Sequence, residues 1–255
     1  MRIRIKLIAS KSVTQTEHSM RYFSVPLAIA LSVFSSVVSA DALGLYVGGG
    51  MWNHDPDGTF GTMGDGSIDT KSDLGYSADS DIYLFAAVEH FIPMVPNLRV
   101  ESSSLEQVGS ATSLTFNGVA VSGDSLTALD TIDTIAYWRV LDNWVNFDFG
   151  LNVRKVDADF NIDAESISVS ETIPMLYLAA QFDLPFTDIS VGADINHISY
   201  SGIKYQDVRL RALYEVGVIG FEAGIKTTSI EFDDVDNVNA DLEFTGLMVG
   251  AFMHF

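Results

Sequence analysis

The most constraining feature of the sequence is an alternation of apolar and polar residues that recurs along most of the chain. In residues 145–154 the odd positions carry Val, Phe, Phe, Leu and Val, while the even positions carry Asn, Asp, Gly, Asn and Arg. Residues 189–196 repeat the pattern. Successive side chains of a β-strand point to opposite faces, so a period of two predicts strands with one apolar face and one polar face. Helical spacing of apolar residues is poor, and we therefore expect an all-β chain.

Ten segments follow this pattern, and the lengths of their connections alternate. The segments are 42–53, 81–91, 98–109, 126–141, 145–160, 172–183, 188–199, 203–215, 218–231 and 242–255. Short connections alternate with longer polar ones, which are 54–80, 110–125, 161–171 and 232–241, although 200–202 is a short turn. Short turns at one rim and long loops at the other are typical of an antiparallel transmembrane β-barrel. We expect about ten strands, with eight or twelve as alternatives, and both termini on the short-turn rim.

The first 40 residues have the composition of a secretory signal peptide. An apolar run at 25–38 follows several basic residues and ends in the small residues Ser39 and Ala40. The run is too short for a membrane-spanning helix, which needs roughly 20 residues. We expect export with removal of residues 1–40, which leaves 41–255 as one barrel domain. Met20 is an alternative start, because residues 20–40 form a complete signal on their own.

Charge and cysteine content exclude several functions. The chain has 34 acidic and 14 basic residues, a formal net charge of −20 and no cysteine. Such a balance repels phosphates, so nucleic acid is not an expected partner. The absence of cysteine excludes disulfides, cysteine metal sites, thiol nucleophiles and a lipoprotein anchor. No cofactor is expected.

Alternation alone also fits a soluble periplasmic β-protein, which stays an alternative. The C-terminal segment favours a barrel in a bacterial outer membrane, because its apolar face ends in a terminal Phe, the pattern that barrel-assembly machinery binds. That face carries Leu247, Val249, Ala251, Met253 and Phe255. Outer-membrane lipid and the assembly machinery are therefore the expected partners. Four aromatic residues near the short turns would form an interfacial girdle: Phe91, Trp144, Phe182 and Phe186.

The polar faces of the expected strands carry thirteen charged side chains, seven acidic and six basic. They are Glu89, Arg99, Glu101, Asp133, Arg139, Asp148, Arg154, Asp194, Asp207, Arg209, Arg211, Glu222 and Lys226. A ten-stranded barrel is narrow, and charges in a restricted interior must be paired or hydrated. We expect an ion-pair network that fills the lumen and gives the protein a structural role. A narrow solute pathway is the alternative. In either case Glu222 should pair with Arg209 or Arg211 across a hairpin.

Several stretches resemble one family of proteobacterial outer-membrane β-barrels, the outer-membrane proteins with Gly-Gly. These stretches are residues 89–99 (EHFIPMVPNLR), 141–144 (LDNW), 148–151 (DFGL) and the glycines 48–50. The resemblance extends over 41–255, although Phe91 stands where Pro often follows the His. It implies a barrel in the outer membrane. It implies no established activity, so it assigns no catalytic residues.

Two further interpretations remain open. Acidic residues cluster in 54–80 and 232–241, and we expect them to form a solvated acidic rim; because carboxylate oxygens suit Ca²⁺, a calcium site there is the alternative. An outer-membrane hydrolase, protease or lipid-modifying, is the alternative to a structural role. Its site at the outer rim would use His54 with Asp55, or His197 with Ser199, although the sequence fixes no partner for either imidazole.

Overall fold

A computed structural model describes residues 43–255 except 63, 65, 93, 117, 143, 236 and 237. The expected signal peptide, its cleavage site and Met20 lie outside the described residues. The strands are β1 (Leu43–Thr62), β2 (Ile68–Asp69), β3 (Asp79–His90), β4 (Asn97–Phe116), β5 (Val119–Asp142), β6 (Val145–Ile162), β7 (Glu165–Asp183), β8 (Ile189–Tyr200), β9 (Ile203–Val216), β10 (Ile219–Val235) and β11 (Val238–His254). No helix among the described residues is long and apolar enough to cross a membrane.

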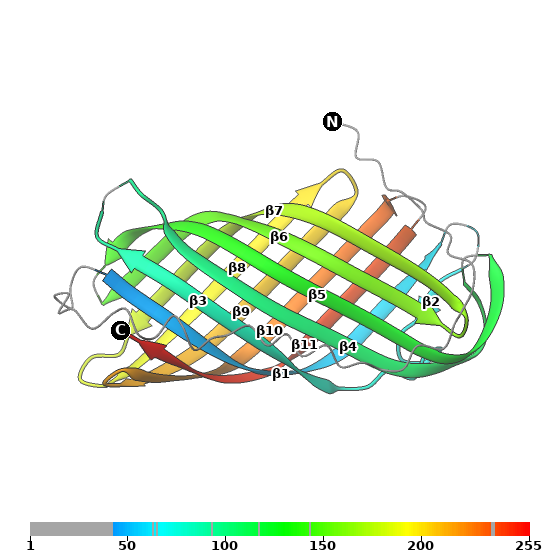
Figure 1. Cartoon of the computed structure of the whole chain (residues 1–255), viewed down its shortest axis with the longest axis horizontal. Coiled ribbons are helices and arrows are strands. Elements are labelled where there is room, and N and C mark those ends of the chain that lie inside the picture. Colours follow the sequence, from blue (N-terminus) through cyan, green and yellow to red (C-terminus); the bar gives the residue numbers. More distant parts are fainter. Residues whose placement is uncertain are drawn as a thin grey trace, which may run out of the picture. The chain divides into compact units, whose positions relative to one another are not determined.

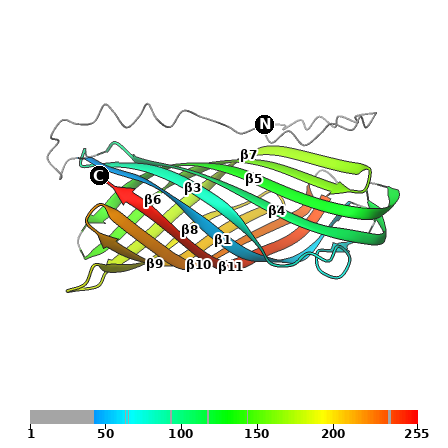
Figure 2. The same cartoon turned by 60° about the horizontal axis from the view of Figure 1, so that its bottom comes forward.

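The ten long strands form one closed antiparallel barrel, which confirms the expected fold (Figures 1 and 2). Each long strand pairs with its neighbour in the chain, and β11 closes the barrel on β1. At the seam the backbones of Leu45 and Phe255 exchange two hydrogen bonds of 2.9 Å. Residue 43 and the C-terminus therefore lie at the same rim, here called the terminal rim. The opposite rim is called the far rim.

Three of the four expected long loops are wrong. Strands occupy nearly all of 110–125, 161–171 and 232–241. They extend the hairpins β4–β5 and β6–β7 beyond β8 and β9, while β10 continues only a few residues past its pairing with Ile203 at the start of β9. β1 likewise continues to Thr62, so the connection to β3 is shorter than expected. The expectation failed because the outward side chains change from apolar to polar within each of these strands, and the polar part resembles loop sequence.

Outward side chains next to the terminal rim form an apolar belt. On β6 they are Val145, Phe147, Phe149, Leu151 and Val153. The same pattern holds on the neighbouring strands, and the first outward polar residues lie level across paired strands, as with Lys155 and Thr172, Thr227 and Thr245, and Asn53 and Ser80. A strand stretch like 145–153, tilted by about 40°, spans roughly 20 Å, close to the apolar band of outer-membrane barrels.

Beyond the belt the two faces exchange character. Outward residues of β6 are now Lys155, Asp157 and Asp159, while inward residues of the same strand are Val156 and Ala158. The interior of this extension is an apolar core that holds Phe60, Leu105, Phe116, Val121, Ile162, Ile230, Leu242 and Phe244. The barrel thus has a polar interior behind an apolar surface near the terminal rim and an apolar interior behind a polar surface near the far rim.

The segment between β1 and β3 closes this apolar core at one side. Leu74 is fully buried, and Ile68 and Tyr76 are nearly so. The Tyr76 hydroxyl lies 2.7 Å from the Ser125 hydroxyl, and the Ser110 N–H donates to the Leu74 carbonyl at 2.7 Å. These contacts hold the segment against β4 and β5.

Candidate functional site

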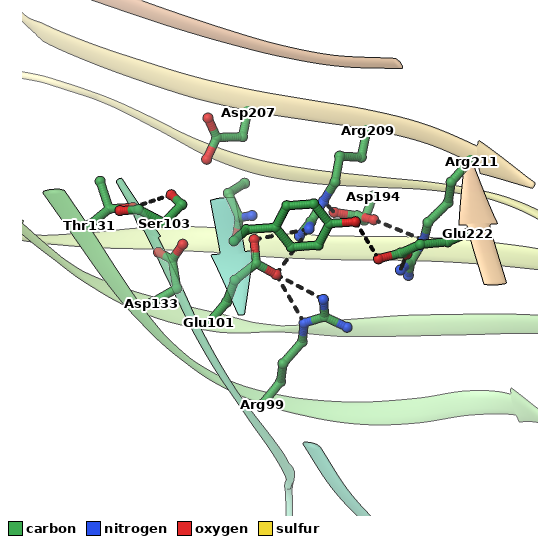
Figure 3. A network of polar contacts seen from close by, with 12 residues as sticks. Arg99, Glu101, Ser103, Thr131, Asp133, Asp194, Asp207, Arg209, Arg211 and Glu222 are labelled. Atoms are coloured by element: carbon green, nitrogen blue, oxygen red, sulfur yellow. Dashed lines mark hydrogen bonds and ion pairs between the residues drawn. The ribbon is translucent and has the colours of Figure 1, made fainter. Parts of the chain in front are cut away.

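The structure places all thirteen charged side chains of the expected network on inward positions. Its centre is Glu101 on β4, which is 4% exposed. Nη1 of Arg209 lies 2.9 Å from both Glu101 oxygens, and Nη2 of Arg99 donates to Glu101 Oε2 at 2.8 Å (Figure 3). Nε of Arg209 also donates to Asp194 at 2.9 Å. Arg209 therefore joins β9 to its neighbour β8 and to β4 across the lumen.

Towards the terminal rim the next pair is Arg211 with Glu222. Arg211 Nη1 donates to Glu222 Oε2 at 3.1 Å, as the β9–β10 hairpin register predicts. The Tyr83 hydroxyl donates to the other oxygen of Glu222 at 2.7 Å. Nε of Arg211 lies 3.6 Å from Oδ1 of Asp194, and neither atom has a hydrogen-bond partner among the described residues. Glu222 is 3% exposed, so its charge is balanced within the protein.

Towards the far rim the network centres on Arg154 of β6, which is 3% exposed. Its Nε and Nη2 each donate to Asp133 at 2.7 Å, and Nη2 also contacts Asp207. Asn152 donates to Asp133 at 2.7 Å, and the Thr228 hydroxyl donates to Asp207 at 2.7 Å. One guanidinium thus contacts two buried carboxylates, and neutral donors complete their hydrogen bonding.

Closest to the terminal rim, Arg139 of β5 binds two carboxylates. It forms a bidentate pair with Glu89, at 2.8 and 3.0 Å, and Nε donates to Asp148 at 3.0 Å. The Tyr137 hydroxyl also donates to Glu89 at 2.7 Å. Arg139 is 26% exposed, so water reaches this group more easily than the others.

Lys226 differs from the other basic residues in its contacts. Its ammonium lies 4.4 Å from the centroid of the Trp52 ring, a cation–π distance, and the residue is 8% exposed. By contrast, five arginines in the lumen each form at least one ion pair with a lumen carboxylate: Arg99, Arg139, Arg154, Arg209 and Arg211.

Sequence reasoning missed the neutral partners of the network. They are Tyr83, Tyr137, Asn152, Asn196 and Thr228. The signal was present, because these residues occupy the same alternate positions as the charged ones. The glycines near the start of β1 also belong to this packing: a Cβ at Gly50 would lie 2.5 Å from the Tyr83 hydroxyl, so glycine allows the tyrosine to reach Glu222.

A polar cavity of about 160 Å³ lies within the part of the network nearest the terminal rim. Its lining includes Glu89, Arg139, Arg211, Glu215 and Glu222. A volume of this size has room for a few water molecules, whereas Glu101, Arg209 and Arg154 further from the terminal rim are at most 5% exposed.

The histidines are placed differently from the expected hydrolase pairs. His54 is fully buried and its Nε2 lies 2.8 Å from Asp81, while Nδ1 faces Gln107 at 3.3 Å. Asp55, the expected partner, points outward and accepts a 3.0 Å bond from Lys71. Among the described residues, His197 has no hydrogen bond to Ser199, and its buried Nδ1 has no hydrogen-bond partner. Asp55 is thus the wrong partner for His54.

The acidic segment after β1 is organised by backbone donors. The N–H groups of Ser72 and Lys71 donate to Asp69 at 2.7 and 3.0 Å. Hydrogen bonds from Ser72 lower the pKa of Asp69 below its usual value, and the bond to Asp55 raises the pKa of Lys71. Among the described residues no group of three or more acidic or histidine side chains could hold a metal ion.

The residues of the expected assembly signal alternate outward along β11 to the end of the chain, and all five are exposed: Leu247, Val249, Ala251, Met253 and Phe255. The four aromatic residues of the expected girdle lie at the terminal rim. Phe91, Trp144 and Phe186 are exposed, and the Phe182 ring packs edge-on against Trp144 with centroids 5.1 Å apart.

The fold resembles solved outer-membrane proteins at low identity. The outer-membrane protease OmpT from Escherichia coli is 9% identical with a TM-score of 0.49, over 87% of this chain and 99% of that chain. Neisserial surface protein A is 11% identical with a TM-score of 0.38, over 83% and 97%. The attachment invasion locus protein Ail of Yersinia pestis is 13% identical with a TM-score of 0.35, over 84% and 99%. No protein-family model and no curated protein matches the chain. With identities and scores this low, the likenesses carry no argument about activity or ligand.

Proposed function

We propose that this chain is an integral outer-membrane β-barrel with a structural role, whose lumen is closed to solutes by ion pairs. The observation that carries the proposal is the apolar belt around a charged interior. Exposed side chains such as Phe149, Leu151 and Leu210 would be unfavourable in water but are stable against lipid tails. A soluble periplasmic protein would need the opposite arrangement at this level of the barrel.

Two features support a closed lumen over the narrow-pore alternative. Within the belt, Glu101, Arg209, Arg154 and Asp133 are each less than 6% exposed. Arg209 binds Glu101 across the interior, and Arg154 binds Asp133 on the neighbouring strand. Beyond the belt, the apolar core around Phe60 fills the barrel, and an ion would have to shed its hydration to pass it. A solute would therefore meet two unlike barriers in series.

The proposal includes a route to the membrane. Residues 1–40 act as a cleaved export signal, residues 41–255 form the barrel, and the terminal strand with Phe255 is bound by the assembly machinery. Membership of the Gly-Gly outer-membrane family is part of the same proposal, supported by the sequence resemblance. The far rim and its long hairpins then face the outside of the cell, as in other outer-membrane barrels with short periplasmic turns.

A hydrolase is not part of the proposal. The imidazole of His54 is fully buried and its ring contacts Trp52, with centroids 4.7 Å apart, and Phe244. A general base must reach its substrate within hydrogen-bond distance, directly or through one water. His54 and Asp81 are better explained as a buried polar pair that joins β1 to β3.

The experiment combines location with conductance. Cells that express the chain are fractionated, and the outer-membrane fraction is run on gels with and without boiling. We expect a heat-modifiable band there, and planar bilayers with purified protein should show no steady current. The triple variant Arg209→Ala, Arg211→Ala, Glu222→Ala, which empties part of the network, is the matched comparison, and its current should be at least that of the wild type. Recovery in the soluble fraction would contradict the membrane location, and a large steady wild-type current would establish the pore instead.

A further inference from the structure

The strand β7 leaves one edge without a partner over residues 165–175. This stretch pairs with β6 throughout, from Glu165 opposite Ile162 to Met175 opposite Asn152. The ladder with β8 begins only at Leu176 opposite His197. Among the described residues, no backbone hydrogen bond links 165–175 to a segment other than β6. Figure 1 shows this part of β7 at the border of the protruding hairpins.

The direction of the unpaired groups follows from the register. The N–H of Asp183 donates to the carbonyl of Trp144, just before β6, so odd residues of β7 direct their backbone groups to β6. The ladder has no register shift, so even residues face the other way. Pro174 is such a residue, and its missing N–H leaves the β6 ladder intact. The free N–H and C=O groups therefore belong to Ser166, Ser168, Ser170 and Thr172, whose side chains are exposed.

Two comparable edges elsewhere in the extension are contacted at least in part by other segments of the chain. On β4, Glu106 N–H donates to Asp81 at 2.9 Å and Ser110 N–H donates to Leu74 at 2.7 Å. On β10, Asp233 N–H donates to the carbonyl of Gly202 at 2.8 Å. An uncovered edge is a template for another strand, and proteins normally block such edges. The open edge of β7 is therefore a candidate binding site for a strand of another molecule.

The charge around this edge favours a basic partner. Residues 104–130 and 155–172 contain one basic residue, Lys155, and eight acidic ones: Glu106, Asp124, Asp130, Asp157, Asp159, Asp163, Glu165 and Glu171. On the strand beside the edge, Asp157 and Asp159 point outward and accept bonds from Ser170 and Ser168. On the inner face, Ile167 and Ile173 pack against the apolar core and remain partly exposed. An added strand would need apolar residues inward and basic residues outward.

A second copy of the chain does not fit this edge. Two copies in one membrane both run β7 from the far rim to the terminal rim, so their edges cannot pair antiparallel. A two-fold axis along the membrane normal would also place the two tilted strands at a large angle to each other, so that they could not form a ladder. Their acidic faces would repel each other as well.

We propose that the free edge of β7 binds an extended basic segment of another protein by β-strand addition. Backbone hydrogen bonds to Ser166, Ser168, Ser170 and Thr172 give the affinity, and alternate apolar side chains extend the core. Lysine or arginine side chains on the outer face neutralise Asp157 and Asp159. This role goes beyond the proposed structural function. Because the edge lies beyond the apolar belt, binding should occur with the barrel in detergent as well as in a membrane.

The probe is a short fluorescent peptide of alternating Lys and Val with blocked ends, titrated by anisotropy against the refolded full barrel in detergent. Its control is the same peptide with N-methyl groups on the backbone nitrogens that would pair with β7. The barrel variant is Ser168→Pro with Ser170→Pro, which removes two edge N–H groups on the side away from β6. The matched control is Ser168→Ala with Ser170→Ala, which keeps both.

We expect the N-methylated peptide, and the proline variant, to bind about tenfold more weakly or worse, while the alanine variant binds as the wild type does. Asp157→Asn with Asp159→Asn should weaken binding mainly at low salt. Equal binding of the methylated and unmethylated peptides to the wild type would overturn strand addition and establish adsorption to an acidic surface. That comparison needs no variant, so it decides the question even if the proline variant misfolds.

Discussion

Replacing Arg154 by Met should be among the most destabilising single changes in the barrel. The guanidinium makes two 2.7 Å bonds to Asp133 and a further contact to Asp207, and both carboxylates are 4% exposed. At an effective dielectric constant of about 20, one ion pair at 4 Å is worth about 4 kcal/mol. Part of this offsets the cost of desolvating the charges, so loss of one partner is expected to cost about 3–5 kcal/mol.

Neighbouring positions supply the control. Lys155 lies on the outer face and pairs with Asp157 at 2.6 Å, but these side chains are 53% and 44% exposed. An exposed pair contributes at most about 1 kcal/mol, so Lys155→Met should change stability little. The triple variant Arg154→Met, Asp133→Asn, Asp207→Asn should recover much of the loss, because no uncompensated carboxylate remains.

The free energy of unfolding is measured by urea titration of the barrel refolded in lipid vesicles, followed by tryptophan fluorescence. If Arg154→Met and Lys155→Met cost the same, the lumen around Asp133 is hydrated and the filled-lumen reasoning is wrong. The same conclusion follows if the triple variant is no more stable than Arg154→Met alone.

Three further predictions test the belt, the far-rim segment and the seam. Leu151→Arg should destabilise the barrel in vesicles by about 2–4 kcal/mol, while Asp159→Arg on the same face beyond the belt should cost little. If both changes lowered the free energy of unfolding equally, the edge of the apolar belt on β6 would be wrongly placed. Because bonds from Ser72 lower the folded pKa of Asp69, the turn that it holds should be intact above the ordinary pKa of about 3.8 and be lost as the pH falls through the lower, folded pKa. An NMR titration of the Asp69 carboxyl checks this, and a midpoint at or above the ordinary value would refute it. Deleting Phe255 removes both 2.9 Å seam bonds to Leu45 and the terminal aromatic, so heat-modifiable protein should fall sharply in membrane fractions.

Much of the membrane part of the barrel could be predicted from the sequence. Apolar and polar side chains alternate regularly along a strand that has lipid on its outer side and a polar lumen on its inner side. The outward facing of Phe149 and the inward facing of Asp148 follow from it, and so does the pairing of Arg211 with Glu222, since a hairpin register needs only the turn. The contact of Arg209 with Glu101 could not be derived in this way. It crosses the lumen between residues 108 positions apart, and only the closed geometry of the barrel brings them together.

The extension escaped prediction for a different reason. Sequence reasoning treated one polarity, apolar outside and polar inside, as the rule for the whole chain. Near Arg154 that polarity reverses within a single strand, although the side chains keep their faces. A stretch such as 165–172 then shows Ser and Thr outward with Ile167 and Val169 inward, which is the pattern of a strand in water. Pro174 was a usable signal as well, because proline in a strand marks an edge.

The reversal itself locates the membrane on the protein. Faces are fixed along a strand, so a change from apolar to polar on the outer face means that the medium changes there from lipid to water. The inner face changes in the opposite sense at the same level, where Arg154 gives way to Val156. Where the barrel is surrounded by lipid, its outer face is apolar, and the ion pairs give the strands a polar inner face. If the inner face were apolar too, nothing would determine which face of a strand turns towards the lumen. A wall with water behind it gains stability from an apolar core, as any soluble barrel does. The charged network therefore fills the part of the barrel that lipid surrounds, and the apolar core fills the part that water surrounds.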